Sequence, residues 1–203
     1  MTDRHVAVIL FDGFELLDVF GPVELLYVTP GFTIGYYGPQ RGPIASSQGG
    51  QVVAEHSYDE LMDPDIILVP GGVGTRRLVE DDAFLKQLKA IGTSADLVTS
   101  VCTGSALLAA AGLLEGYRAT SNKLAFGWAS SFGTTVEWVT TARWVHDRDR
   151  WTSSGVAAGM DMAAALIADL CGTEVARDAT VVTELEVHTD SAWDPFAAVH
   201  GLA

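Results

Sequence analysis

The sequence predicts an α/β fold with a mainly parallel central sheet. Short apolar runs, typical of strands covered on both faces, alternate along the chain with segments whose apolar residues recur at helical spacing. Strands that alternate with helices are usually parallel and joined by crossover helices. Glycine-containing turns follow two of the apolar runs, and an open α/β sheet binds its ligands at such strand ends.

The expected strands share an apolar or β-branched composition bounded by turn residues. The core strands are expected at His5–Phe11, Phe32–Tyr37, Asp65–Val69 and Leu97–Val101. Further β-structure is expected over Ile44–His56, over Arg118–Ser121, and in a hairpin with arms Val136–Trp144 and Arg150–Ser153 and a turn at 146–149.

The expected helices are amphipathic or mostly apolar segments between these strands. They are Glu15–Tyr27, Arg77–Ile91, Gly104–Leu114, Gly155–Leu170 with Gly172 as its C-cap, and Thr173–Val187 with Thr173 as its N-cap. Gly21-Pro22 should kink the first helix or restart it. The tail segment Trp193–Phe196 is expected to dock on the body. Because no linker or repeat is evident, we expect one domain over residues 1–203.

Composition narrows the classes of partner. A formal net charge of −14 with only 12 Lys and Arg residues argues against binding to nucleic acid. The apolar run Val6–Phe11 is too short for a membrane span or a signal segment, so neither a membrane partner nor a secretory route is expected. Two cysteines do not make a disulfide framework, and we expect a cytoplasmic protein with reduced thiols.

Cys102 stands where a buried strand meets a helix, in the stretch Ser100-Val101-Cys102-Thr103-Gly104. A nucleophile elbow needs small residues on both sides of the nucleophile, because the turn is sharp. The start of the following helix should favour the thiolate, and its N–H groups can stabilise an oxyanion. A buried core cysteine is the alternative reading. Cys171, at the end of an apolar helix, is expected to be a structural thiol.

Two further features lie at the same predicted sheet edge. The turn Pro70-Gly71-Gly72-Val73-Gly74 ends a core strand, and glycine there lets the backbone approach a ligand. Asp18 interrupts an apolar stretch of the first helix. It is either a solvent-facing acid or a carboxylate that points into a pocket, and the residues alone leave both readings open.

Taken in order along the chain, Asp18 with Gly21-Pro22, the turn at 70–72, the elbow at 100–104 and the stretch 153–161 resemble the ThiJ/PfpI superfamily. The resemblance spans about residues 5–187. It implies a flavodoxin-like three-layer sandwich related to the class I glutamine amidotransferases, and usually a homodimer. The aspartate in Leu-Asp-Val-Phe-Gly-Pro and the Cys-Thr pair resemble the isocyanide hydratase branch.

The resemblance also implies a site. The Cys102 thiolate would lie beside the carboxyl of Asp18, which Thr103 would contact, and the N–H groups of Gly72 and Thr103 would form an anion pocket. Gly71, Val73 and Asn122 complete the predicted oxyanion and substrate-binding set. Asn122 departs from the histidine usual at this position, and an amide cannot act as a base. A Cys-His-acid triad, and with it a protease, is therefore disfavoured.

Three hypotheses of function follow. The first is hydration of a small isocyanide to an N-substituted formamide through a Cys102 thioimidate, with Asp18 as general acid and base and without metal or organic cofactor. The second is a non-catalytic redox sensor or binding protein with an oxidisable Cys102. The third is glyoxalase or amidase chemistry at the same elbow.

Overall fold

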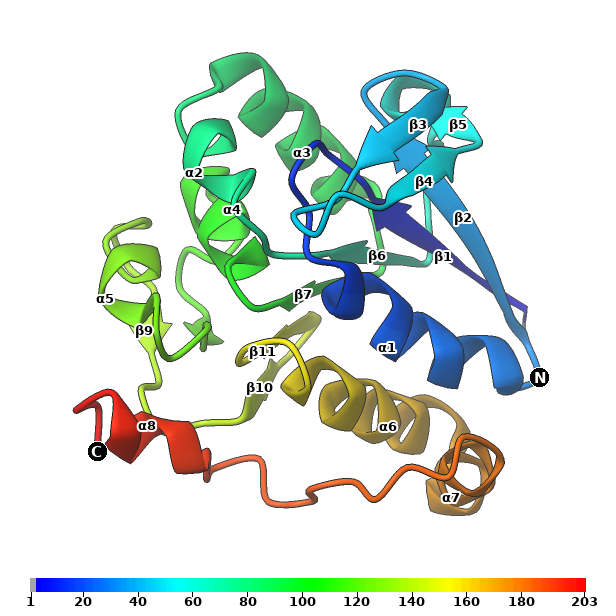
Figure 1. Ribbon diagram of the computed structural model, residues 1–203, viewed down its shortest axis with the longest axis vertical. Coiled ribbons are helices and arrows are strands. Elements are labelled where there is room, and N and C mark those ends of the chain that lie inside the picture. The colour runs from blue at the N-terminus through cyan, green and yellow to red at the C-terminus, as the bar shows by residue number, and fades with distance from the viewer. Residues whose placement is uncertain (1–2) are drawn as a thin grey trace.

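A seven-stranded sheet forms the centre of the protein in a computed structural model that describes residues 3–203 (Figure 1). Residues 1 and 2 of the predicted domain lie outside the described part. The strand order is β10-β11-β7-β6-β1-β2-β5, and every neighbouring pair is parallel except β10 with β11. These strands are β1 Arg4–Ile9, β2 Phe32–Gly38, β5 His56–Ser57, β6 Ile66–Val69, β7 Leu97–Val101, β10 Trp144–Asp147 and β11 Arg150–Ser153.

Helices cover both faces of this sheet. α1, α6 and α7 lie together on one face, and α2, α3 and α4 on the other (Figure 1). The helices are α1 Leu16–Val28, α2 Thr75–Leu78, α3 Asp82–Ser94, α4 Gly104–Ala110, α5 Phe126–Ala129, α6 Ala158–Cys171, α7 Thr173–Val182 and α8 Pro195–Val199, with a 3₁₀ turn at Tyr58–Glu60. The predicted three-layer α/β sandwich is confirmed.

Two small sheets flank the central one. β3 Gly42–Ala45 and β4 Gln51–Ala54 form an antiparallel hairpin within the expected excursion, and β8 Arg118–Ala119 pairs in parallel with β9 Glu137–Trp138. The predicted hairpin arm Val136–Trp144 is therefore wrong. The arm is β10, and His146 lies in a strand rather than in the turn.

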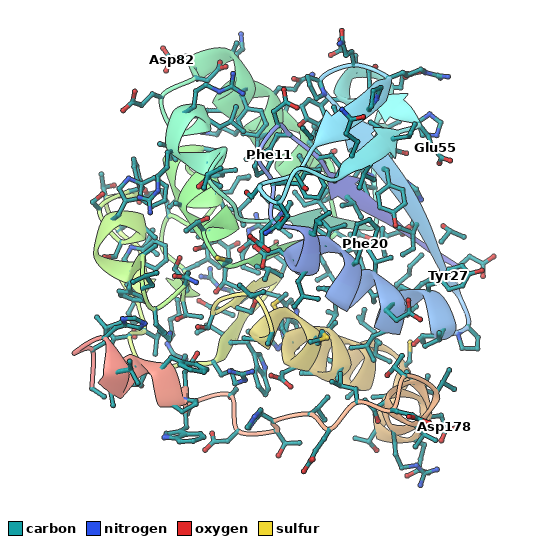
Figure 2. The ribbon with its side chains drawn as sticks, in the orientation of Figure 1. Phe11, Phe20, Tyr27, Glu55, Asp82 and Asp178 are labelled. Carbon is teal, nitrogen blue, oxygen red and sulfur yellow. The ribbon has the colours of Figure 1, made fainter. Side chains whose placement is uncertain are left out.

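The central strands are apolar along their whole length because helices cover both of their faces. Val8 of β1 and Ile67 of β6 are fully buried, and each such side chain contributes about 1.5–3 kcal/mol to folding. Phe11, labelled in Figure 2, belongs to this interior, whereas Tyr27 and Asp178 lie at the periphery.

One predicted helix divides into two. The segment Arg77–Ile91 is interrupted between α2 and α3 because Asp81 caps the start of α3. The Asp81 carboxylate accepts hydrogen bonds from the backbone N–H groups of Ala83 and Phe84, at 3.1 and 3.0 Å. The Asp81 carboxylate thus bonds two of the backbone N–H groups that have no partner within the first turn of a helix.

Gly21-Pro22 was predicted to kink the first helix or to restart it. The restart is wrong, since α1 runs through the pair with Pro22 in its interior. Packing against α6 explains why residue 21 is glycine. A Cβ on Gly21 would lie 2.7 Å from the Met160 side chain, so glycine permits the close approach of the two helices. Pro22 leaves one backbone hydrogen bond of α1 unmade.

Other predicted helix ends also shift. α4 ends at Ala110 instead of Leu114, and α7 ends at Val182 instead of Val187. Gly172 has a φ of 97° at the end of α6, as its predicted C-cap role requires, and it also precedes α7. Thr173 is the first residue of α7 and not its N-cap.

Candidate active site

The elbow at Cys102 combines a strained backbone with dense hydrogen bonding. Cys102 has a φ of 59°, which is unfavourable for a residue with a side chain. Its N–H donates to the carbonyls of Ser153 and Ser154, at 3.2 and 3.1 Å. Its own carbonyl accepts from the hydroxyls of Ser105 and Ser121, both at 3.0 Å. These bonds hold the cysteine in a conformation that it would otherwise avoid.

Glycine is required two residues after Cys102. A Cβ on Gly104 would lie 2.2 Å from the carbonyl oxygen of Val69, at the end of the neighbouring strand β6. The elbow therefore fits against β6 only when residue 104 is glycine.

Asp18 is a fully buried acid, with 0% of its surface exposed. Its Oδ2 accepts a hydrogen bond from the N–H of Gly71 at 2.8 Å, and its Oδ1 has no hydrogen-bond partner among residues 3–203. Burial raises the pKa of Asp18 to about 7, against the opposing effect of the Gly71 N–H. The structure thus excludes the solvent-facing reading of Asp18. Glu24, one and a half turns along α1, is the exposed acid.

Cys102 is 7% exposed, and burial followed by the charge of Asp18 raises the pKa of its thiol above the ordinary value. The backbone N–H of Thr103 acts in the opposite direction. The expectation that the following helix favours the thiolate therefore needs correction. α4 has only seven residues, and burial together with the charge of Asp18 disfavours the thiolate.

Val156 is a site residue that the sequence analysis did not single out. Its N–H lowers the pKa of both Asp18 and Cys102, which indicates that Val156 lies close to the two groups. Its φ of 47° is a second strained backbone position in the site. The sequence signal for Val156 was its position shortly after the predicted strand that becomes β11. This strand lies parallel to β7 and ends at the same edge of the sheet.

The turn after β6 is used differently from the prediction. The Gly72 N–H donates to Thr103 Oγ1 at 3.1 Å, and the Val73 N–H donates to Ser47 Oγ at 3.3 Å. Neither N–H is free to hold an oxyanion. Thr103 Oγ1 also accepts from the Thr75 hydroxyl, so the Thr103 side chain binds the turn rather than the Asp18 carboxylate.

Gly71 supplies the contact that the prediction gave to Thr103. A Cβ there would lie 2.6 Å from the Thr103 nitrogen and 2.9 Å from Asp18 Oδ2. Glycine thus brings the backbone between the acid and the elbow, which allows its N–H to reach the carboxylate.

Asn122 lies at the border of the site. Its Oδ1 accepts from the N–H of Ala125 at 2.9 Å, and its amide nitrogen would be 2.2 Å from a Cβ on Gly155. The side chain thus supports the loop that precedes Val156. Together, the strand ends of β6, β7 and β11 and the start of α1 form the candidate site.

The chain matches the DJ-1/PfpI family over residues 4–169, which is most of its length. It belongs to the DJ-1/PfpI family. A curated relative, isonitrile hydratase of Pseudomonas putida, is 33% identical over 173 residues, covering 85% of this chain and 75% of the relative. A ThiJ/PfpI family protein from Pseudomonas syringae superposes with a TM-score of 0.81 at 29% identity, covering 99% of this chain and 84% of that one.

Regulators also carry this family's domain. The transcriptional regulator GbdR of Pseudomonas aeruginosa is 30% identical over 181 residues, which cover 85% of this chain. The chain spans only 48% of the length of that regulator. Membership of the DJ-1/PfpI family therefore establishes the fold, and the activity has to be argued from the site.

Among residues 3–203, no three His, Cys, Asp or Glu side chains are grouped so that they could bind a metal ion. Over the same residues, no helix has the length and apolar character that crossing a membrane requires.

Proposed function

We propose that the protein is a cysteine-dependent hydratase that converts a small isocyanide to an N-substituted formamide. The observation that carries this proposal is the buried Asp18 carboxyl beside Cys102, with a pKa raised to about 7. Such a group can donate and accept a proton near neutral pH, which is what a general acid and base needs. The similarity to isonitrile hydratase supports the choice of substrate class.

The first step forms a carbon–sulfur bond. The sulfur of Cys102 attacks the terminal carbon of the isocyanide while Asp18 takes the thiol proton. Asp18 then delivers a proton to that carbon, which leaves an uncharged thioimidate on the cysteine. Because burial disfavours a resting thiolate, the transfer to Asp18 activates the sulfur only when the substrate is in place.

The second step adds water. Asp18, again ionised, removes a proton from a water molecule as it attacks the thioimidate carbon, and the nitrogen gains a proton. The carbon–sulfur bond then breaks with return of a proton to the sulfur, and the formamide leaves. In the net reaction, one isocyanide and one water give one formamide. The two hydrogens of the water end on the carbon and the nitrogen, and its oxygen becomes the carbonyl oxygen.

Replacement of Asp18 by asparagine tests this role. Asp18→Asn keeps the shape and removes the proton, so turnover of small isocyanides should fall by about 10²–10⁴-fold. Glu24→Gln is the matched control, since it makes the same change at an exposed position of α1 and should leave turnover within about twofold. Equal activity of Asp18→Asn and wild type, measured by formamide release, would exclude the mechanism.

A redox sensor is the second candidate, favoured by the family's presence in transcriptional regulators. A protonated carboxyl beside the sulfur could hydrogen-bond a sulfinate as well as serve catalysis. The same isocyanide assay, together with panels of glyoxals and amides and with Cys102→Ala as a blank, separates the two. Absence of turnover on every panel, with Cys102 oxidised by peroxide, would favour the sensor.

A further inference from the structure

Four charged side chains are buried together away from Asp18 and Cys102. Lys123, Arg143, Asp161 and Asp194 are each at most 5% exposed. Arg143 Nε donates to Asp161 Oδ2 at 2.6 Å, and Asp161 Oδ1 accepts from the N–H of His188 at 2.9 Å. Burial of charge is unfavourable unless the groups are paired, and loss of one partner costs more than the pair contributes.

Asp194 connects this cluster to the C-terminal segment. Its N–H donates to Thr141 O at 2.8 Å, and its Oδ1 accepts from the N–H of Phe196, which caps α8. Its Oδ2 has no hydrogen-bond partner among residues 3–203 and lies 3.9 Å from Arg143. The charge of Asp194 also raises the pKa of Lys123, which burial lowers to about 8. Asp194 therefore acts on both cations through its charge.

Lys123 connects the cluster to the elbow. Its Nζ donates to Thr120 Oγ1 at 2.8 Å and to Ala142 O at 2.6 Å. Between Thr120 and Lys123 lies Ser121, whose hydroxyl donates to the carbonyl of Cys102. The segment 120–123 is thus held at one side by the buried charges and at the other by the strained cysteine.

Asn122 belongs to the same segment and lies against Gly155. Next to Gly155 is Val156, whose N–H lowers the pKa of both Asp18 and Cys102 and so lies close to them. A displacement of segment 120–123 would therefore disturb two supports of the site, namely the Ser121 bond to the elbow and the loop that presents Val156.

We propose that Asp194 and Lys123 are positioning residues of the cysteine site, so that the C-terminal segment is part of the active centre although it never touches the substrate. The Asp194 carboxylate lies 3.9 Å from Arg143, and Lys123 donates to Thr120 and Ala142. Segment 120–123, which these buried groups border, keeps the Cys102 elbow closed through Ser121. The inference depends on Cys102 being the reactive group and not on which substrate it takes.

Alkylation of the two cysteines tests the proposal without any substrate. Iodoacetamide labelling is followed by mass spectrometry between about pH 7 and pH 10, with Cys171 as the internal reference. In Asp194→Asn, which retains an acceptor for the α8 cap, an opened elbow exposes the thiol and relieves its desolvation. The ratio of Cys102 to Cys171 labelling should rise about threefold or more, and the midpoint of the Cys102 pH profile should move down.

Asp190→Asn is the matched control, because it removes the same charge from an exposed position of the same segment. Its labelling ratio and pH profile should equal those of wild type. The double variant Lys123→Met/Asp194→Asn leaves no uncompensated buried charge, so it keeps the test open if the single variant fails to fold. It also lacks the Lys123 bonds, and Cys102 should again be labelled faster than in wild type.

Two results would overturn the proposal. One is an unchanged labelling rate for both cysteines in variants that circular dichroism shows to be folded. The other is an equal rise for Cys102 and Cys171, which is the signature of general loosening and would assign the buried charges to stability alone.

Discussion

At the scale of single residues, Asp18 and Cys102 titrate as a pair. Ionised Asp18 raises the pKa of the thiol, whereas the neighbouring thiol lowers the pKa of Asp18. The first proton therefore leaves from Asp18, and removal of a second from the same buried site is opposed. A reaction that moves one proton back and forth between the two groups suits this arrangement.

The raised pKa of Asp18 makes a prediction about stability. Its pKa is about 7 in the folded protein against 3.8 when exposed, so the folded state binds the extra proton. The stability that this proton contributes is complete below about pH 4 and is lost as the pH rises through 7. Above that pH the protein carries a buried carboxylate.

Asp18→Asn should therefore stabilise the protein at pH 8 relative to wild type, by up to about 4 kcal/mol in the free energy of unfolding. The gain should be smaller at about pH 5, where the native carboxyl is protonated. Urea denaturation at the two pH values measures both. A constant difference between variant and wild type would contradict the burial of an ionisable Asp18.

At the scale of elements, the site forms where β6, β7 and β11 end beside the start of α1. β1 pairs with β2 on one side and with β6 on the other. Strands that follow β1 in sequence are therefore added first on one side of it and then on the other, so the strand order reverses there. Strand ends at such a switch point leave room for a ligand. The glycine turn after β6 brings its backbone against the segment that follows β1.

Gly72 and Gly42 allow a controlled test of that contact. Their φ values are 124° and 128°, so alanine is strained at both. At Gly72 a Cβ would lie 2.3 Å from Gly13 O, whereas at Gly42 nothing lies within 4 Å. Gly72→Ala should cost about 3 kcal/mol or more, and Gly42→Ala about 1–2 kcal/mol. Similar losses in thermal unfolding would mean that the turn can move away from Gly13.

At the scale of the whole molecule, the C-terminal segment docks as predicted but by other means. Trp193 and Phe196 are 54% and 55% exposed, while Asp194 and Ala197 are buried. Charge and backbone hydrogen bonds attach the segment, and the aromatic rings remain at the surface. The apolar residues Leu17 and Phe20 of α1 are also partly exposed.

The homodimer implied by the family resemblance remains a prediction, and α1 offers a surface for it. Phe20 and Leu17 line a groove of about 280 Å³ between α1 and the end of α7. Light scattering should give twice the chain mass of 21.5 kDa. Phe20→Glu should halve this mass, whereas Val53→Glu, at an exposed position of β4, should not. A wild-type mass of 21.5 kDa would refute the dimer.

The α/β class, the four core strands and the elbow at Cys102 could be predicted from the sequence alone. Each of these leaves a local mark, namely an apolar run, a turn residue or a small neighbour of a nucleophile. Helix boundaries were harder to predict from the sequence. Asp81 and Pro22 can each end or continue a helix, depending on what packs against that helix.

Only the tertiary structure decided what the site residues do. Asp18 could have faced solvent, and its pKa follows from burial by segments remote in sequence. The N–H groups of Gly72 and Val73 found partners in Thr103 and Ser47, which no spacing reveals. Val156, Lys123 and Asp194 gained their roles in the same way. Desolvation and hydrogen bonding depend on neighbours in space, whereas the sequence records neighbours along the chain.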